Sequence, residues 1–262
     1  MMEINTQILK NIVRDAGLAI MEIYNLPMQF SEVEAKSDNS PLTKADKAAN
    51  EVIVKALQKN YPAIPLISEE EKEVPFETRQ SWDYFWLIDP LDGTKEFIKR
   101  NGEFTVNIAL IHHNYPVQGF IYVPVTDEYY FTEGNQAFYQ KGENEAIAIK
   151  VSNKTQDLIA LGSRSHAKPE DEEFLSKLPI SGLKNFGSSL KFCKVADATA
   201  DIYYRSGPTM EWDTAAGQAI LEKAGGKVTD LKGERFRYNK ESLLNGGFVA
   251  SSFIIEQLTL NS

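Results

Sequence analysis

Residues 84–97 read Tyr84-Phe85-Trp86-Leu87-Ile88-Asp89-Pro90-Leu91-Asp92-Gly93-Thr94-Lys95-Glu96-Phe97. The apolar run at the start of this stretch predicts a buried strand. Two acids follow, separated by a proline, whose φ is fixed, and a leucine, and then comes a glycine, which tolerates unusual backbone angles. A tight turn after Ile88 can therefore point Asp89 and Asp92 at one spot, beside the Thr94 hydroxyl. This oxygen-only cluster suits a hard cation such as Mg²⁺; the alternative is an acidic surface turn that caps a helix.

The composition is that of a soluble globular enzyme with one large domain or two packed domains. The chain has 262 residues, of which 42% are hydrophobic and 25% charged. A net charge of −9 argues against nucleic-acid binding, which needs a basic face. It does not exclude a small phosphorylated substrate, because a bound metal supplies positive charge locally.

Cysteine usage and the chain start indicate a reducing, cytoplasmic setting. Cys193 is the single cysteine, and we interpret it as a small buried hydrophobe. With only three histidines beside it, a zinc site built from Cys and His is disfavoured. The first residues lack a basic n-region, and no apolar run reaches membrane-spanning length, so no integral membrane segment is expected.

Hydrophobic periodicity predicts a layered α+β or mixed α/β protein. The first helix should end before Pro27, and the second should begin near Thr43, whose spacing to Asp46 resembles a capping box. Further helices are expected at 169–178, 190–200 and 214–224, the last ending at Gly225-Gly226. Strands are expected at 64–67, 105–111, 117–123, 129–132, 137–140, 158–162, 228–229 and 248–250. Short turns between 105 and 140 predict an antiparallel meander, and a soft boundary near residue 150 separates an N-terminal subdomain (1–150) from a C-terminal one (151–262).

Acids at four places could converge on the same site: Asp46, Glu69-Glu70, Asp89 with Asp92, and Asp213. Each group also has a structural interpretation. Asp46 could serve the capping box, the glutamates could be a solvated acidic run, and Asp213 could be an N-cap. Together, however, they match a two-metal phosphatase, in which carboxylates surround two cations. Small residues after Trp212-Asp213 would let a phosphate approach a helix N-terminus.

Three blocks of the sequence resemble, in chain order, the signature blocks of the inositol monophosphatase superfamily. They are Ser68-Glu69-Glu70, Asp89-Pro90-Leu91-Asp92-Gly93-Thr94, and Trp212-Asp213-Thr214-Ala215-Ala216-Gly217. The resemblance spans the whole chain and implies an αβαβα sandwich and a Mg²⁺-dependent, lithium-sensitive phosphatase.

Three further segments resemble one branch, the bacterial CysQ type of 3′(2′),5′-bisphosphate nucleotidases. They are the run from Lys95 to Phe104, and the segments Ser163-Arg164-Ser165-His166 and Gly187-Ser188-Ser189-Leu190-Lys191-Phe192-Cys193. This branch removes the 3′-phosphate of adenosine 3′,5′-bisphosphate, a by-product of sulfate assimilation, giving AMP and phosphate. Weak association with the inner face of the membrane, reported for some such enzymes, is left open.

The resemblance also implies roles for individual residues. The metals would be held by Glu69, Asp89, the Leu91 carbonyl, Asp92 and Asp213, with Asp89 bridging the two principal Mg²⁺ ions. Thr94, oriented by Asp46, would help to activate the attacking water. Glu69 could bind either this water or a weaker third metal ion. The N–H groups of Gly93 and Thr94 would hold the scissile phosphate. The nucleotide contacts would be His166, Ser188, Lys191 and Arg205.

The nucleotide contacts and the overall function have alternatives. His166 could be a surface-loop histidine, Arg205 a strand-end charge, and Ser188 part of a helix cap. An inositol or sugar monophosphatase would share the metal blocks but not the nucleotide contacts. A silent nucleotide-binding module is the alternative from another class, and no residue favours it, because every required acid is present.

Overall fold

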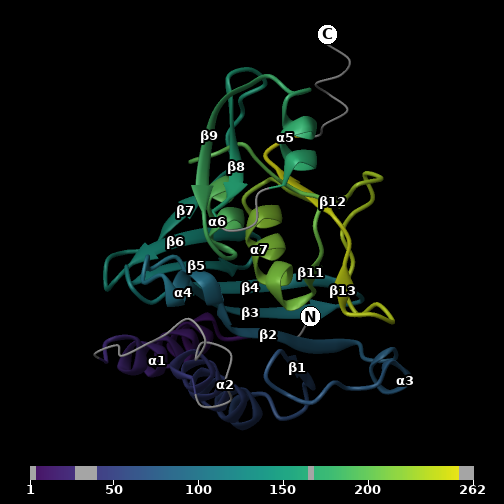
Figure 1. The fold of residues 1–262 in the computed structure, drawn as a ribbon. Coiled ribbons are helices and arrows are strands. Elements are labelled where there is room, and N and C mark those ends of the chain that lie inside the picture. The colour runs from purple at the N-terminus through teal and green to yellow at the C-terminus, as the bar shows by residue number, and fades with distance from the viewer. Residues whose placement is uncertain (1–3, 27–39, 165–167, 254–262) are drawn as a thin grey trace.

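The computed structural model describes residues 4–26, 40–164 and 168–253. Figure 1 shows helices and sheets in alternating layers, from a helix pair beneath the first sheet to a helix above the second. This arrangement confirms the predicted layered fold class and the αβαβα sandwich. Within the described residues, no helix is long and apolar enough to cross a membrane.

The outermost layer consists of α1 (Thr6–Tyr24) and α2 (Pro41–Asn60), which pack against each other and against the first sheet. The end of α1 before Pro27 is confirmed. α2 begins at Pro41, two residues before the expected position, but the predicted capping box of Thr43 and Asp46 is wrong, because the Ser40 side chain caps the helix by accepting from the Thr43 amide at 3.2 Å. Asp46 therefore lies inside the helix and has no capping role there.

The first sheet contains seven strands in chain order, with β1 parallel to β2 and every later pair antiparallel. The strands are β1 (Leu66–Ser68), β2 (Tyr84–Asp92), β3 (Thr105–His112), β4 (Tyr115–Val123), β5 (Glu128–Glu133), β6 (Gln136–Lys141) and β7 (Ile147–Ile149). The predicted meander is confirmed, and β7 was not predicted. Short helices α3 (Phe76–Arg79) and α4 (Thr94–Ile98) flank β2.

The expected tight turn after Ile88 is wrong. β2 continues through Asp92, and its pairing with β3 becomes irregular between Asp89 and Asp92. The chain leaves the strand only at Gly93, where φ is 103°, a conformation that glycine adopts without a Cβ clash. An irregularity in a strand re-aims its side chains as a turn would.

The second sheet has the strand order β12-β14-β10-β8-β9. Its strands are β8 (Leu158–Ser163), β9 (Ile180–Phe186), β10 (Ile202–Arg205), β12 (Lys227–Asp230) and β14 (Phe248–Ser251), while β11 (Thr209–Met210) and β13 (Leu244–Asn245) pair separately. β9 was not predicted, because it lies at the sheet edge with mostly exposed side chains and has no apolar run. The predicted boundary near residue 150 falls between β7 and β8, which belong to different sheets.

Helices α6 (Leu190–Ala196) and α7 (Trp212–Lys223) form the layer between the sheets, and α5 (Pro169–Leu175) lies beyond the second sheet (Figure 1). α5 and α6 end earlier than predicted. Glycine allows close packing of β4 against α7, since a Cβ on Gly119 of β4 would lie 2.3 Å from the Ala216 carbonyl oxygen. Cys193 is fully buried in this layer, as predicted.

Candidate active site

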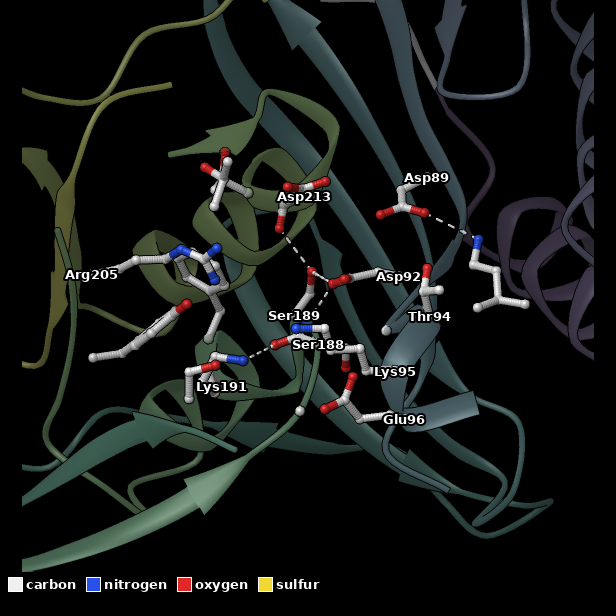
Figure 2. Close-up of a pocket in the computed structure, with 18 of the residues that line it drawn as sticks. Asp89, Asp92, Thr94, Lys95, Glu96, Ser188, Ser189, Lys191, Arg205 and Asp213 are labelled. Carbon is white, nitrogen blue, oxygen red and sulfur yellow. Dashed lines mark hydrogen bonds between the residues drawn. The ribbon is translucent and has the colours of Figure 1, made fainter. Parts of the chain in front are cut away.

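One cavity of about 350 Å³ opens where β1 and β2 end and where α4, α6 and α7 begin. Apart from Asp46 and His166, every residue predicted for the site lines it: Glu69, Asp89, Leu91, Asp92, Gly93, Thr94, Ser188, Lys191, Arg205 and Asp213. Figure 2 shows the acids of β2 on one side and Lys191 and Arg205 on the other. His166 lies outside the described residues.

The irregular end of β2 orients its two acids. Asp89 is only 1% exposed, and its Oδ1 accepts from the Leu91 amide at 3.1 Å. Asp92 Oδ2 accepts from both the amide and the hydroxyl of Ser189 at the start of α6. Ser189 Oγ also donates to the Asp213 carbonyl oxygen at 2.8 Å, so one side chain connects α6 to β2 and α7.

Three carboxylates from separate elements converge at the cavity. Glu69, Asp89 and Asp213 each place one oxygen within 4.8 Å of the other two. The Glu69 amide donates to the Ile88 carbonyl at 3.2 Å, which holds the residue beside β2. Asp213 is not the N-cap of α7, because Glu211 has that position; instead, its Oδ2 accepts from the Met210 amide at 2.8 Å.

The electrostatics of these acids fit a cation. Although the Glu69 side chain is exposed to the cavity, loss of hydration there, then the charges of Asp92 and Glu70, raise its pKa to about 7. Burial, followed by the charge of Asp92, raises the pKa of Asp213 to about 8. Burial and the neighbouring acids also raise the pKa of Asp89 well above its ordinary value. Carboxylates at this spacing repel one another unless protons or metal ions compensate their charge.

Asp46 approaches this cluster from α2 rather than lining the cavity. It is 8% exposed, and burial, then the charges of Glu70 and Glu69, raise its pKa to about 8. Its buried Oδ1 has no hydrogen-bond partner within the part of the chain that the structure describes. A buried carboxylate oxygen without a donor costs stability, so it is usually retained for a function.

The opposite side of the cavity is basic and aromatic. Lys191 is 3% exposed, donates to the Ser188 carbonyl at 2.6 Å, and has a pKa that burial lowers to about 8 while Asp92 acts in the opposite direction. Its ammonium lies 5.1 Å from the centre of the Tyr203 ring. Arg205 donates to the Pro208 carbonyl at 3.1 Å. Two cations facing several acids across one cavity suit an anionic ligand with more than one charged group.

The residues at this site that were not predicted from the sequence include Ser189, Asn107 and Tyr203. Ser189 follows Ser188 directly, but its contact with Asp92 joins residues 97 positions apart. Asn107 is paired with Asp89 across β2 and β3, and its Nδ2 donates to Ser189 Oγ at 2.9 Å. Strand register would have located Asn107; no local pattern marks Tyr203 as a cavity residue.

Comparison with known proteins relates this geometry to one family. The model of the inositol monophosphatase family matches residues 2–259. The 3′(2′),5′-bisphosphate nucleotidase CysQ of Escherichia coli strain K12 is 46% identical over 246 residues, covering 92% of this chain and 97% of that protein. The CysQ nucleotidase of Buchnera aphidicola is 44% identical over 244 residues, covering 92% and 91% respectively.

Solved structures show the same fold. The crystal structure of CysQ from Bacteroides thetaiotaomicron, described as a bacterial member of the inositol monophosphatase family, superimposes with a TM-score of 0.85. It is 43% identical, and the match covers 94% of this chain and 97% of that one. The suhB protein of Bartonella henselae is 24% identical, has a TM-score of 0.75 and covers 98% of this chain and 97% of its own, which is a likeness of fold alone.

Proposed function

The chain belongs to the inositol monophosphatase family, and we propose that it is a Mg²⁺-dependent 3′(2′),5′-bisphosphate nucleotidase. In this proposal it hydrolyses the 3′-phosphate of adenosine 3′,5′-bisphosphate to give AMP and phosphate. The observation that best supports this proposal is the cavity, in which converging carboxylates face Lys191 and Arg205. Relatives more than 40% identical are named as nucleotidases of this type, which supports the same assignment.

The acids provide oxygen ligands of the kind that Mg²⁺ prefers. Glu69, Asp89, Asp92 and Asp213, with the Leu91 carbonyl, would hold two ions, and Asp89, the most buried of these acids, would supply charge to both, as the family resemblance implies. When bound, the metal pair supplies positive charge to the phosphate and lowers the pKa of a coordinated water. The positive charge of the two metal ions would also offset the repulsion between these acids, whose pKa values are raised when no metal is bound.

Thr94 and Asp46 would control the proton of the attacking water. Thr94 is the first residue of α4 and faces the cavity. If the unpartnered Asp46 Oδ1 accepts a hydrogen bond from the Thr94 hydroxyl, the lone pairs of the Thr94 oxygen remain free to accept from water. The water oxygen is then oriented for attack on phosphorus, while the amides of Gly93 and Thr94 donate to the phosphate oxygens.

The basic side of the cavity would recognise the second phosphate. Lys191 is held by two backbone carbonyls, of Ser188 and Phe186, so its ammonium is positioned before a ligand arrives. A bound phosphate would favour the charged form of this lysine, opposing the lowering of its pKa by burial. Arg205 would add a second cation, and Ser188 and His166 complete the proposed nucleotide contacts. A monophosphate leaves these groups without a charged partner.

Product identity tests this proposal. Purified protein is incubated with adenosine 3′,5′-bisphosphate and Mg²⁺, and chromatography separates adenosine 5′-phosphate from adenosine 3′-phosphate. We expect the 5′-phosphate and one equivalent of inorganic phosphate, and no reaction after chelation of the metal. Formation of the 3′-phosphate, or equal turnover without metal, would contradict the proposed reaction.

A further inference from the structure

A second group of metal-ligand side chains lies at the other end of β2 from the cavity. It consists of Asp83, His112 and His113, and it contains two of the three histidines in the chain. Asp83 precedes β2, whereas His112 ends β3 and His113 follows it. Because a strand rises about 3.3 Å per residue, the six positions from Asp83 to Asp89 separate the two places by roughly 20 Å. The group is thus distinct from the candidate active site.

The hairpin between β3 and β4 brings the two histidines together. Neighbouring residues of a strand point to opposite faces, so His112 and His113 would diverge if the strand continued. Instead, His113 and Asn114 form a two-residue turn with φ values of 47° and 67°. Positive φ at both positions defines the turn that matches the twist of a hairpin. The His113 amide also donates to the Asp83 carbonyl at 3.2 Å, which fixes the turn to the start of β2.

The donor atoms already have the spacing of metal ligands. His112 Nε2 lies 3.3 Å from Asp83 Oδ1, and His113 Nδ1 lies 3.1 Å from the same oxygen. All three donor atoms lie within 4.8 Å of one another. Zn²⁺ binds nitrogen and oxygen at about 2.0–2.2 Å, so neighbouring ligands of a tetrahedral site are about 3.4 Å apart. Both observed spacings are close to that value.

Packing holds the rings in this arrangement. The Tyr84 ring stacks on His112 with centroids 4.0 Å apart and an interplanar angle of 9°. The His112 and His113 rings are 3.9 Å apart at 34°. The side chain of His112 is 27% exposed and that of His113 is 75% exposed, so one ligand is anchored and the open side faces solvent. Ligands that are oriented before binding lose less freedom when a metal arrives.

We propose that Asp83, His112 and His113 form a second metal site, which binds a divalent transition metal such as Zn²⁺, Ni²⁺ or Cu²⁺. Imidazole nitrogen suits these borderline metals, whereas Mg²⁺ prefers oxygen ligands and keeps its water. Three protein ligands leave the remaining positions to water. The metal would fasten the start of β2 to the β3–β4 turn, and the chemistry of the donors separates it from the all-oxygen active site.

Binding spectroscopy on a protein without a histidine tag tests the site. Saturating Mg²⁺ first occupies the carboxylates of the cavity, and Cu²⁺ is then added up to one equivalent. We expect nitrogen hyperfine splitting from two imidazoles in the electron paramagnetic resonance spectrum, and an affinity for Zn²⁺ that calorimetry can measure. A spectrum without nitrogen ligands would overturn the proposal and leave the group as a purely structural contact between Asp83 and the two histidines.

Two variants identify the ligands. The double substitution His112→Phe with His113→Asn keeps an aromatic ring on Tyr84 and a residue that tolerates positive φ, but removes both imidazoles. It retains His166 as the only histidine, so any binding through that residue persists. We expect Zn²⁺ affinity to fall by at least about tenfold. Asn114→Gly changes the same turn without removing a ligand and should bind as the unaltered protein does; equal binding by all three proteins would refute the site.

Discussion

Asp89 has the least exposed carboxylate in the candidate active site, and four other acids raise its pKa after burial does. Its proposed place between two cations is implied by the family resemblance, and its burial among other acids is consistent with that role. At the residue scale the motif that contains it was readable from the sequence, because a hydrophobic run followed by spaced acids is a local pattern. What could not be read was the orientation, which depends on an irregular strand pairing and on the contact with Leu91.

Asp89→Asn tests the metal-bridging role. The substitution preserves shape but removes the negative charge shared by both ions, so we expect kcat to fall by at least about a thousandfold. Asp157→Asn is a matched control, since this exposed aspartate has a φ of 53°, which asparagine also tolerates. Steady-state phosphate release measures both variants. Turnover by Asp89→Asn within a few-fold of the control would refute the role.

At the scale of elements, the ends of strands and helices were less predictable than their existence. The helix spacing of α1 and the short turns of the meander are local, and both were predicted. The start of α2 was misplaced because Ser40 and Thr43 both offer cap chemistry, and only the packed structure selects Ser40. β9 was missed because it lies at the sheet edge, where most of its side chains are exposed and no apolar run marks the strand.

Ser189→Ala tests how α6 supports the site. The hydroxyl donates to Asp92 and to the Asp213 carbonyl, so its loss should leave both acids less well oriented. We expect apparent Mg²⁺ affinity to fall by about 10–100-fold, the effect usual for groups that orient metal ligands. Metal-dependence curves of activity measure this change. Ser176→Ala removes an exposed serine hydroxyl at the end of α5 and should change nothing; the same Mg²⁺ affinity in both variants would argue against the orienting role.

Gly119→Ala tests the close contact between α7 and β4. Its new methyl group would lie 2.3 Å from the Ala216 carbonyl oxygen and 2.9 Å from Ala219, so helix and strand must separate. Overpacking of this kind costs about 1–3 kcal/mol in the free energy of unfolding. Urea denaturation provides the measurement. Gly246→Ala is the control, because nothing lies within 4 Å of the added atom; equal stability of the two variants would contradict the packing argument.

At the scale of the whole molecule, the fold gathers its acids at an energetic cost that metal ions can offset. The family resemblance predicted the layered sandwich. That α7 packs against both sheets could not be predicted from the sequence and is seen only in the structure. We retain the two subdomains, 1–150 and 151–262, as a proposal. Residues from both ranges contribute to one apolar core, which includes Phe85 and Ile111 from the first and Phe192 and Phe248 from the second.

The raised carboxyl pKa values predict a pH-dependent effect of Mg²⁺ on stability. Asp46 and Asp213 have pKa values of about 8 and Glu69 of about 7 in the folded protein, against about 4 in unfolded chains. The stabilisation that comes from these protons is complete below about pH 4 and is lost as the pH rises through the folded-state pKa values of about 7 and 8. Without metal, stability should therefore fall as the pH rises from about 4 to about 8, and Mg²⁺ should restore it.

Thermal unfolding with and without Mg²⁺ measures this linkage. We expect the rise in Tm caused by Mg²⁺ to be larger at pH 8 than at pH 5.5, because protons compete with the metal at the lower pH. Asp89→Asn should show a smaller rise at pH 8. A rise in Tm that is equal at both pH values, or larger at pH 5.5, would contradict the proposed exchange of protons for metal.

The most direct test of the central claim compares kcat/KM for adenosine 3′,5′-bisphosphate and inositol 1-phosphate with Mg²⁺, in the unaltered protein and in Lys191→Met. A charge-assisted contact contributes about 1.5–3 kcal/mol, so losing Lys191 should reduce kcat/KM for the bisphosphate by roughly 10–100-fold. We predict a preference for the bisphosphate that this substitution diminishes, while activity on inositol 1-phosphate changes little. A preference for inositol 1-phosphate, or equal losses on both substrates, would contradict the nucleotidase assignment and indicate a monophosphatase.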